Sequence, residues 1–158
     1  MIAVGGVASG RRRYSGTSGP ADDGSVRCTA AALADARGLP VIGVCSLDAI
    51  GWGARTVVTD ARRKEIYWAV YDADGARTDG PAVVRPEELG RPGPFVGDPA
   101  FAARLGADVV AAGVTTAGLL RAAGPQLADP SSAGPLTPLY LRRPDATPPT
   151  AIKAVSQA

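Results

Sequence analysis

The stretch TDARRKEIYWAVYD, residues 59–72, places an aspartate and three consecutive basic residues before the most aromatic run of the chain. The run EIYWAVYD is rich in β-branched and aromatic residues, which favours a strand. Because side chains alternate along a strand, every second residue should share a face. One face would hold Ile66, Trp68 and Val70, and the other Glu65, Tyr67, Ala69 and Tyr71. We therefore expect Trp68 in the core and residues 60–64 in the turn of a hairpin.

Strand-like runs flank this stretch on both sides. RTVVTD precedes it over residues 55–60, and ARTDGPAVVRP follows over 76–86. Asp74 and Gly75 stand between the second and third runs, and an Asp-Gly pair is a strong hairpin signal. The pattern predicts three consecutive antiparallel strands.

After this meander the pattern changes to alternating helices and strands. PEEL at residues 86–89 predicts a helix start, PFVGD at 94–98 a strand, PAFAARLG at 99–106 a helix, ADVVAAG at 107–113 a strand, and TTAGLLRAAGPQLAD at 115–129 an amphipathic helix. Pro125 should kink or end that last helix, and LYLRR at 139–143 is a further strand candidate. Three meandering strands followed by alternating elements predict an α/β domain with a mixed sheet flanked by helices, as in ribonuclease H-like and actin-like folds.

The first third of the chain is less regular. Residues 1–28 resemble a strand end running into a glycine-rich, aperiodic segment, which we expect to be mobile. Thr29 is a candidate N-cap for a helix that stops near Gly38. VIGVC, residues 41–45, fits a strand buried on both faces, and Ser46 could cap a short helix. We therefore predict a helix-strand-helix unit over 29–54, a main domain over 55–146, and a proline-rich, disordered tail over 147–158.

Composition excludes several classes of function. The 17 basic and 15 acidic residues give a net charge of only +2, too little for a protein that binds mainly by neutralising nucleic-acid phosphates. The absence of histidine removes the usual base of Ser/His and Cys/His nucleophiles and a common zinc ligand. Cys28 and Cys45 are too far apart for a CxxC motif. No apolar run approaches the length of a membrane helix, so we expect a cytoplasmic protein that does not bind membranes.

The residues offer one candidate site and several weaker motifs. Asp60 beside Arg62 and Arg63 could hold a metal or a phosphate, or could be only the solvated turn of the hairpin. The glycines of GGVASG, residues 5–10, match neither GxGxxG nor GxxxxGK[ST], so we predict no nucleotide loop there. We predict no cofactor, no metal site and no catalytic residue.

Three segments together resemble the TsaB (YeaZ) family. They are TAAALADARGLPVIGVCSLDAI, TDARRKEIYWAVYD and PLYLRRPDA, in the family's order and approximate spacing over residues 29–146. The resemblance implies an actin-like ATPase fold of two ribonuclease H-like halves, of which this chain holds mostly the C-terminal one. It also implies a non-catalytic subunit that binds and activates a TsaD-type catalytic subunit in the threonylcarbamoylation of adenosine 37 in tRNA. The other partners that the resemblance implies are a TsaE-type ATPase and a second copy of the chain in a homodimer. It implies contact with tRNA only through the complex.

The first segment of the chain departs from the family pattern. RRRYSGTSGPADDGSVRC stands where members carry a GPGSFTG-like loop, and the helices through which members meet their partners have no counterpart. Two alternatives therefore stay open, a family remnant without partner binding and an actin-fold nucleotide-binding enzyme. The resemblance places Asp60 to Arg63 where ATP-binding relatives have a second phosphate loop, with Ala61 in place of glycine. It suggests cleft or partner contacts by Asp60, Arg62, Tyr67, Tyr140 and Arg142.

Overall fold

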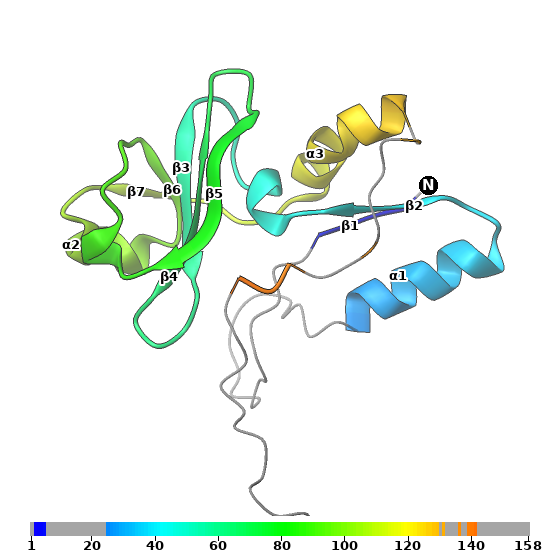
Figure 1. Cartoon of the computed structure of the whole chain (residues 1–158), viewed down its shortest axis with the longest axis horizontal. Helices are drawn as coiled ribbons and strands as arrows, with labels where there is room; N and C mark the ends of the chain where they lie inside the picture. The colour runs from blue at the N-terminus through cyan, green and yellow to red at the C-terminus, as the bar shows by residue number, and fades with distance from the viewer. Residues whose placement is uncertain (1, 6–24, 130, 132–135, 137–138, 142–158) are drawn as a thin grey trace, which may run out of the picture.

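The computed structural model describes residues 2–5, 25–129, 131, 136 and 139–141, which form two groups of strands with their helices (Figure 1). The strands are β1 (Ile2–Gly5), β2 (Val41–Val44), β3 (Arg55–Asp60), β4 (Ile66–Tyr71), β5 (Arg77–Val84), β6 (Phe95–Gly97) and β7 (Val109–Ala111). The α-helices are α1 (Ser25–Ala36), α2 (Ala102–Leu105) and α3 (Thr116–Ala128). Three short 3-10 helices are η1 (Ser46–Ala49), η2 (Pro86–Glu88) and η3 (Pro99–Phe101).

The larger sheet has five strands in the order β5-β4-β3-β6-β7. The β3, β4 and β5 strands are antiparallel neighbours, whereas β6 lies parallel to β3 and β7 parallel to β6. The predicted meander and the two following strands are thereby confirmed, and the sheet is mixed as expected. Parallel strands need crossover connections, and η3 with α2 supplies the one between β6 and β7.

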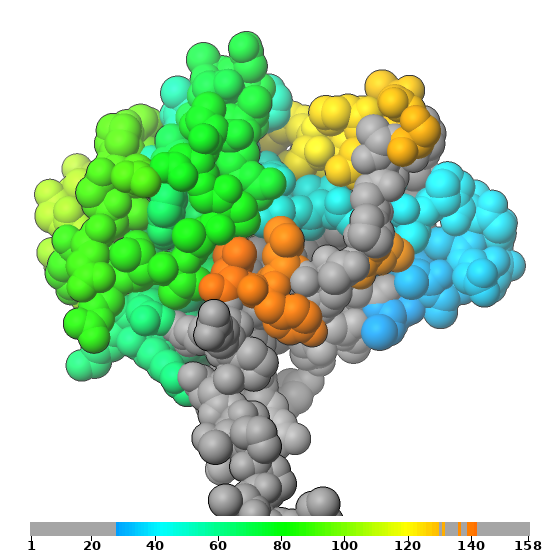
Figure 2. Space-filling view, in the orientation of Figure 1, coloured from blue at the N-terminus to red at the C-terminus, as the bar shows by residue number. Residues whose placement is uncertain are grey.

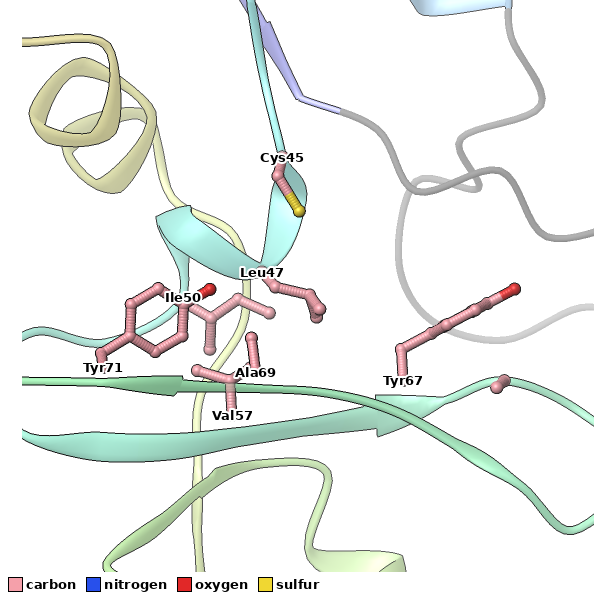
Figure 3. Close-up of a cluster of buried hydrophobic side chains, with 8 residues drawn as sticks. Cys45, Leu47, Ile50, Val57, Tyr67, Ala69 and Tyr71 are labelled. Carbon is pink, nitrogen blue, oxygen red and sulfur yellow. The ribbon is translucent and has the colours of Figure 1, made fainter. Parts of the chain in front are cut away.

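Side chains on both faces of this sheet are buried, in the alternation that the sequence predicts. Ile66 and Trp68 pack on one face with Val58, Leu89, Phe95 and Phe101. Tyr67, Ala69 and Tyr71 pack on the other face with Val57, Cys45, Leu47 and Ile50 (Figure 3). Trp68 is 8% exposed and lies in the core. The strand is therefore apolar on both sides because elements from before and after it cover the sheet.

The smaller sheet is the parallel pair β1 and β2, with α1 on one side and α3 on the other (Figure 1). Ile42 and Val44 of β2 are buried against Ala123 of α3, with Leu119, Ala122 and Leu127 around them. Close contact between α3 and η1 is possible because residue 118 is glycine: an added Cβ there would overlap the carbonyl oxygen of Ala49. The residues that follow β2, Cys45, Leu47 and Ile50, in turn pack against the five-stranded sheet.

The C-terminal residues that the structure describes return to the larger sheet. Leu141 packs against the core cluster that includes Tyr67 and Tyr71. Figure 2 shows the orange residues, which include 139–141, at the molecular surface beside the green strands. LYLRR was predicted to be a strand, yet no strand runs through 139–141, and residues 142 and 143 lie outside the described part of the chain.

Several local predictions about the first third are wrong. The helix α1 begins at Ser25, so Thr29 lies inside it rather than at its cap. The strand β2 buries Ile42 and Val44 but leaves Gly43 exposed, so it is not buried on both faces. The N-cap of η1 is Cys45, without a side-chain hydrogen bond, and Ser46 is the first residue inside η1.

Two further differences concern helix ends and the outer segments. Pro125 does not end α3, which continues to Ala128. The segment predicted to be mobile, 1–28, contributes β1 and the start of α1, and its residues 6–24 lie outside the described part. The tail predicted to be disordered, 147–158, lies outside it as well.

Candidate functional site

A cleft of about 540 Å³ lies at the carboxyl ends of the three parallel strands β3, β6 and β7. Its walls come from Thr59 and Asp60 at the end of β3, residues 97–99 at and just after the end of β6, residues 111–113 at and just after the end of β7, and Ile50. In open α/β sheets ligands bind in the crevice outside the carboxyl ends of the strands. The cleft is therefore the candidate site, and it contains the aspartate that the sequence singled out.

Asp60 and Arg62 are joined by a hydrogen bond and an ion pair at one edge of the cleft. The Asp60 carboxylate accepts a hydrogen bond of 2.7 Å from the backbone N–H of Arg62. Its other oxygen lies 3.4 Å from the Arg62 guanidinium. The Asp60 carboxylate thus interacts with both the backbone amide and the guanidinium of the same residue. Since both side chains are substantially exposed, this ion pair stabilises the fold only modestly.

The β3–β4 turn has an unusual backbone. Arg62, Arg63 and Lys64 all have positive φ angles, of 65°, 53° and 64°. Non-glycine residues in this region are strained, so three in succession persist only where the surroundings hold them. The N–H of Ala61 donates to the carbonyl of Glu65 at 3.0 Å, and the N–H of Glu65 donates to the carbonyl of Arg62 at 2.9 Å. These bonds close the turn on itself.

Arg104 of α2 fixes the turn from outside. Its guanidinium donates to the carbonyl oxygen of Lys64 at 2.9 Å and to the Glu87 carboxylate at 2.7 and 3.0 Å. The hydrogen bond from Arg104 lowers the pKa of Glu87 below its ordinary value. The turn is therefore tied to both η2 and α2, which explains how its left-handed backbone is maintained.

A second carboxylate, Asp98, lines the same cleft. It caps η3, because its carboxylate accepts a hydrogen bond of 3.0 Å from the N–H of Ala100. The neighbouring amides also have protein partners: Asp98 N–H donates to the Val58 carbonyl, and Ala112 N–H donates to the Gly97 carbonyl, each at 3.0 Å. Gly97 is required here, since a Cβ would overlap the carbonyl oxygen of Val58. The cleft floor is thus a tightly bonded backbone bearing two acidic side chains.

A separate polar cluster joins η1 to the five-stranded sheet. The Tyr71 hydroxyl donates to the Asp48 carboxylate at 2.7 Å, and the Arg77 guanidinium lies 3.3 Å from the same oxygen. Arg55, only 3% exposed, stacks over the Tyr71 ring at 3.9 Å and donates to the carbonyl oxygens of Ile50 and Gly53 at 2.7 and 2.8 Å. Burial, together with the Asp48 charge, raises the pKa of Tyr71 far above its ordinary value.

The structure places four of the five predicted contact residues. Asp60 and Arg62 meet at the cleft, whereas Tyr67, opposite Thr59 in the β3–β4 ladder, is 5% exposed. Burial and the Asp60 charge raise the pKa of Tyr67. Tyr140 is 69% exposed on the returning segment. Arg142 lies outside the described residues.

Sequence reasoning missed two acidic residues, Asp98 in the cleft and Asp48 in the separate polar cluster. Asp98 follows a strand that was predicted, and the carboxyl ends of parallel strands meet at one edge of a sheet, so the strand order could have paired it with Asp60. The contact of Asp48 with Tyr71 had no comparable signal, because it joins positions 23 residues apart through tertiary packing.

The described residues offer little for nucleophilic or metal chemistry. Burial and the charge of Asp48 raise the pKa of the Cys45 thiol, which disfavours the reactive thiolate. No group of three or more His, Cys, Asp or Glu residues in this part of the chain is placed to hold a metal ion. Nor does any helix described here have the length and apolar character needed to cross a membrane.

Comparison with known proteins gives relatives and a fold. No protein-family model matches the chain. It is 50% identical over 127 residues to uncharacterized proteins of Mycobacterium tuberculosis and Mycobacterium bovis, covering 76% of this chain and 57% of each relative. An uncharacterized Mycobacterium leprae protein is 49% identical over 128 residues, covering 78% of this chain and 35% of that protein. The chain therefore spans little more than half the length of the relatives that it matches first.

Two solved structures share the arrangement of these elements. One is YeaZ from Pseudomonas aeruginosa, with a TM-score of 0.63 and 24% identity over 78% of this chain and 71% of that one. The other is described as an uncharacterized protein with similarity to peptidase YeaZ from the same organism, with the same score and identity over 70% of its length. At this identity the likeness shows the fold, and the chain accordingly has the actin-like, ribonuclease H-like fold.

Proposed function

We propose that this chain is a TsaB-type subunit that binds and activates a TsaD-type catalytic subunit in the threonylcarbamoylation of adenosine 37 in tRNA. A TsaE-type ATPase and the tRNA would meet it only within that complex, in the cytoplasm. The observation that carries the proposal is the YeaZ-like fold over 78% of the chain. The three family-like segments support it. The first runs from within α1 through η1, and the second covers the end of β3, the following turn and β4. Of the third, only residues 139–141 belong to the described part of the chain.

We further propose that the chain contributes no catalytic group of its own. A peptidase role, which the description of one structural neighbour mentions for YeaZ, would need an activated nucleophile and a base. This sequence contains no histidine. The buried Cys45, whose pKa is raised, lacks the electropositive and accessible surroundings of catalytic cysteines. These features favour a role in binding over a role in bond cleavage.

The test is assembly with the cognate catalytic subunit. The two proteins are mixed and passed over a size-exclusion column, and threonylcarbamoyl transfer to tRNA is then measured with and without this chain. Co-elution together with stimulated transfer is the expected result. Separate elution of a chain that circular dichroism shows to be folded would instead favour a remnant without partner binding.

Exposed side chains can locate the contact. Tyr140→Ala and Arg62→Ala alter two proposed partner contacts, and both side chains reach solvent. Each should weaken co-elution without changing the melting temperature. Arg37→Ala, at an exposed position just after α1, is the matched control and should bind as the natural chain does. Equal binding by all three variants would place the interface elsewhere on the molecule.

A further inference from the structure

The helix α3 lacks the polar outer face that a surface helix usually has. Of its 13 residues, only Arg121 is charged. One side of the helix packs on β2 and η1, through contacts that include Ala123 and Gly118. By helical periodicity the opposite side, called here the outer face of α3, carries Ala117, Leu120, Arg121, Gly124 and Ala128. A helix that is apolar on all sides is normally covered on all sides, so the outer face has the composition of a contact surface.

Two large side chains on or beside the outer face are exposed. Leu120 is 54% exposed, and Trp52, in the loop after η1, is 57% exposed. The Arg121 guanidinium lies 5.5 Å from the centre of the Trp52 ring, so the indole borders the outer face. Figure 2 shows the yellow residues of α3 at the molecular surface. Tryptophan and arginine are enriched among the residues that contribute most to protein–protein binding.

The spacing of residues along the outer face makes it complementary to itself. Leu120, Gly124 and Ala128 are four residues apart, so they form one row along the helix surface. Beyond its own helix backbone and chain neighbours, Gly124 has no atom within 4 Å of the position that a Cβ would occupy. A second helix can therefore approach closely there. If two copies of α3 cross antiparallel at Gly124, Leu120 of each copy faces the small side chain of Ala128 of the other.

The charges near the outer face are arranged with the same symmetry. Arg121 precedes Gly124, and Asp129 follows the helix as its C-cap, with an exposed side chain. Among the described residues no carboxylate forms an ion pair with Arg121. In the antiparallel crossing Arg121 faces residue 127 of the other copy. Because helical side chains tilt toward their own N-terminus, its guanidinium points toward Asp129 of the other copy, and the twofold axis repeats this pair.

We propose that a second copy of this chain docks on the outer face of α3 through its own outer face, with the two helices antiparallel and Gly124 at the crossing point. A second copy is the occupant because both the Leu120–Ala128 row and the Arg121–Asp129 charges match their own image in a twofold dimer, the commonest symmetric assembly. The sequence resemblance implied a homodimer but rests on segments outside α3, so the surface is assigned by these contacts alone. The inference does not depend on the proposed function, because it concerns only copies of this chain.

Sedimentation equilibrium of the full chain tests the surface. The natural chain should form a reversible dimer, of twice its mass of 15.9 kDa, with a Kd of about 0.1 mM or below. Leu120→Asp places a charge in the contact and should raise that Kd at least about tenfold. Leu33→Asp is the matched control, since Leu33 is 51% exposed on α1, and it should leave the Kd within about twofold of the natural value. Circular dichroism confirms that both variants are folded.

Charge reversal keeps the test decisive if Leu120→Asp does not fold. Arg121→Glu and Asp129→Arg each create two like-charge pairs in the dimer and should raise the Kd at least about tenfold, whereas the double variant should return to within about threefold of the natural value.

Three results would overturn the proposal. They are a natural chain that stays monomeric above the expected Kd, a dimer that folded Leu120→Asp leaves intact, and a double reversal that dimerises no better than the single ones. If the natural chain is monomeric and Leu120→Asp instead abolishes co-elution with the TsaD-type subunit, the outer face binds another protein and not a second copy.

Discussion

The Tyr71 hydroxyl donates a 2.7 Å hydrogen bond to the Asp48 carboxylate, joining the last residue of β4 to the 3-10 helix after β2. Arg77 on β5 lies 3.3 Å from the same carboxylate oxygen. Figure 3 shows the Tyr71 ring beside η1, next to Ile50 and Leu47. This charged hydrogen bond lies beside the core cluster that packs η1 against the larger sheet, and it links the two elements directly.

Tyr71→Phe should lower the free energy of unfolding by about 1 to 2 kcal/mol, because a hydrogen bond to a charged group is lost while Asp48 keeps Arg77 as a partner. Urea unfolding followed by circular dichroism measures the change. Tyr140→Phe removes a hydroxyl from an exposed ring and should change stability by less than about 0.5 kcal/mol. Equal stability of Tyr71→Phe and the natural chain would show that the bond contributes nothing.

Alkaline pH should destabilise the fold through the same tyrosine. Burial and the nearby Asp48 raise the pKa of Tyr71, so the folded chain keeps this proton above the pH at which the unfolded chain releases it. The contribution of the protonated Tyr71 to the free energy of unfolding is fully present below the unfolded pKa of about 10. Above that pH it falls by about 1.4 kcal/mol per pH unit. Tyr71→Phe should flatten this dependence. Phenolate absorbance is compared between the natural chain and Tyr71→Phe while both are still folded. An extra rise in the natural chain would show that Tyr71 ionises before unfolding, and would contradict the raised pKa.

The two tryptophans should differ sharply in their effect on stability. Trp68→Ala removes a buried indole, over which Arg91 stacks at 5.0 Å, and should cost about 3 to 5 kcal/mol. Trp52 is 57% exposed, and its ring lies against Gly75 with Arg121 at 5.5 Å. Trp52→Ala should therefore cost about 1 kcal/mol. Thermal unfolding of both variants tests this order, and equal losses would argue against the burial of Trp68.

Two glycines of α3 should respond differently to alanine. Beyond its chain neighbours Gly124 has open space around it, but the ring of Pro125 disfavours helical backbone at a preceding residue with a Cβ, so Gly124→Ala should change stability by less than about 1 kcal/mol. Gly118→Ala would place a methyl group on the Ala49 carbonyl oxygen, forcing α3 away from η1. It should destabilise by about 1 to 3 kcal/mol, as overpacking does. Denaturant midpoints of the two variants decide, and a stabilising Gly118→Ala would mean that the two elements are not in contact.

The strands of the larger sheet could be predicted because their cause is local. Alternation in EIYWAVYD, the Asp-Gly turn and the apolar runs around Phe95 and Val109 each specify an element without reference to distant residues. Helix ends were less predictable. Thr29 is a good N-cap by type, but α1 begins a turn earlier, because packing on β1 and β2 outweighs a cap preference worth about 1 kcal/mol.

Local sequence patterns were enough to predict most strands of the larger sheet, the residues of β4 that face each side, and an acid followed by three bases at one turn. The arrangement of the cleft around that turn became visible only in the folded chain. The Arg62 amide and guanidinium converge on Asp60 because the turn takes a left-handed path that Arg104 holds in place. Asp98 and the loop after β7 join them because parallel strands end at one edge. The Asp60–Arg62 contact is local, but the Arg104 bond to Lys64 and the meeting of Asp60 with Asp98 join segments about 40 residues apart, and a local sequence pattern does not specify such contacts.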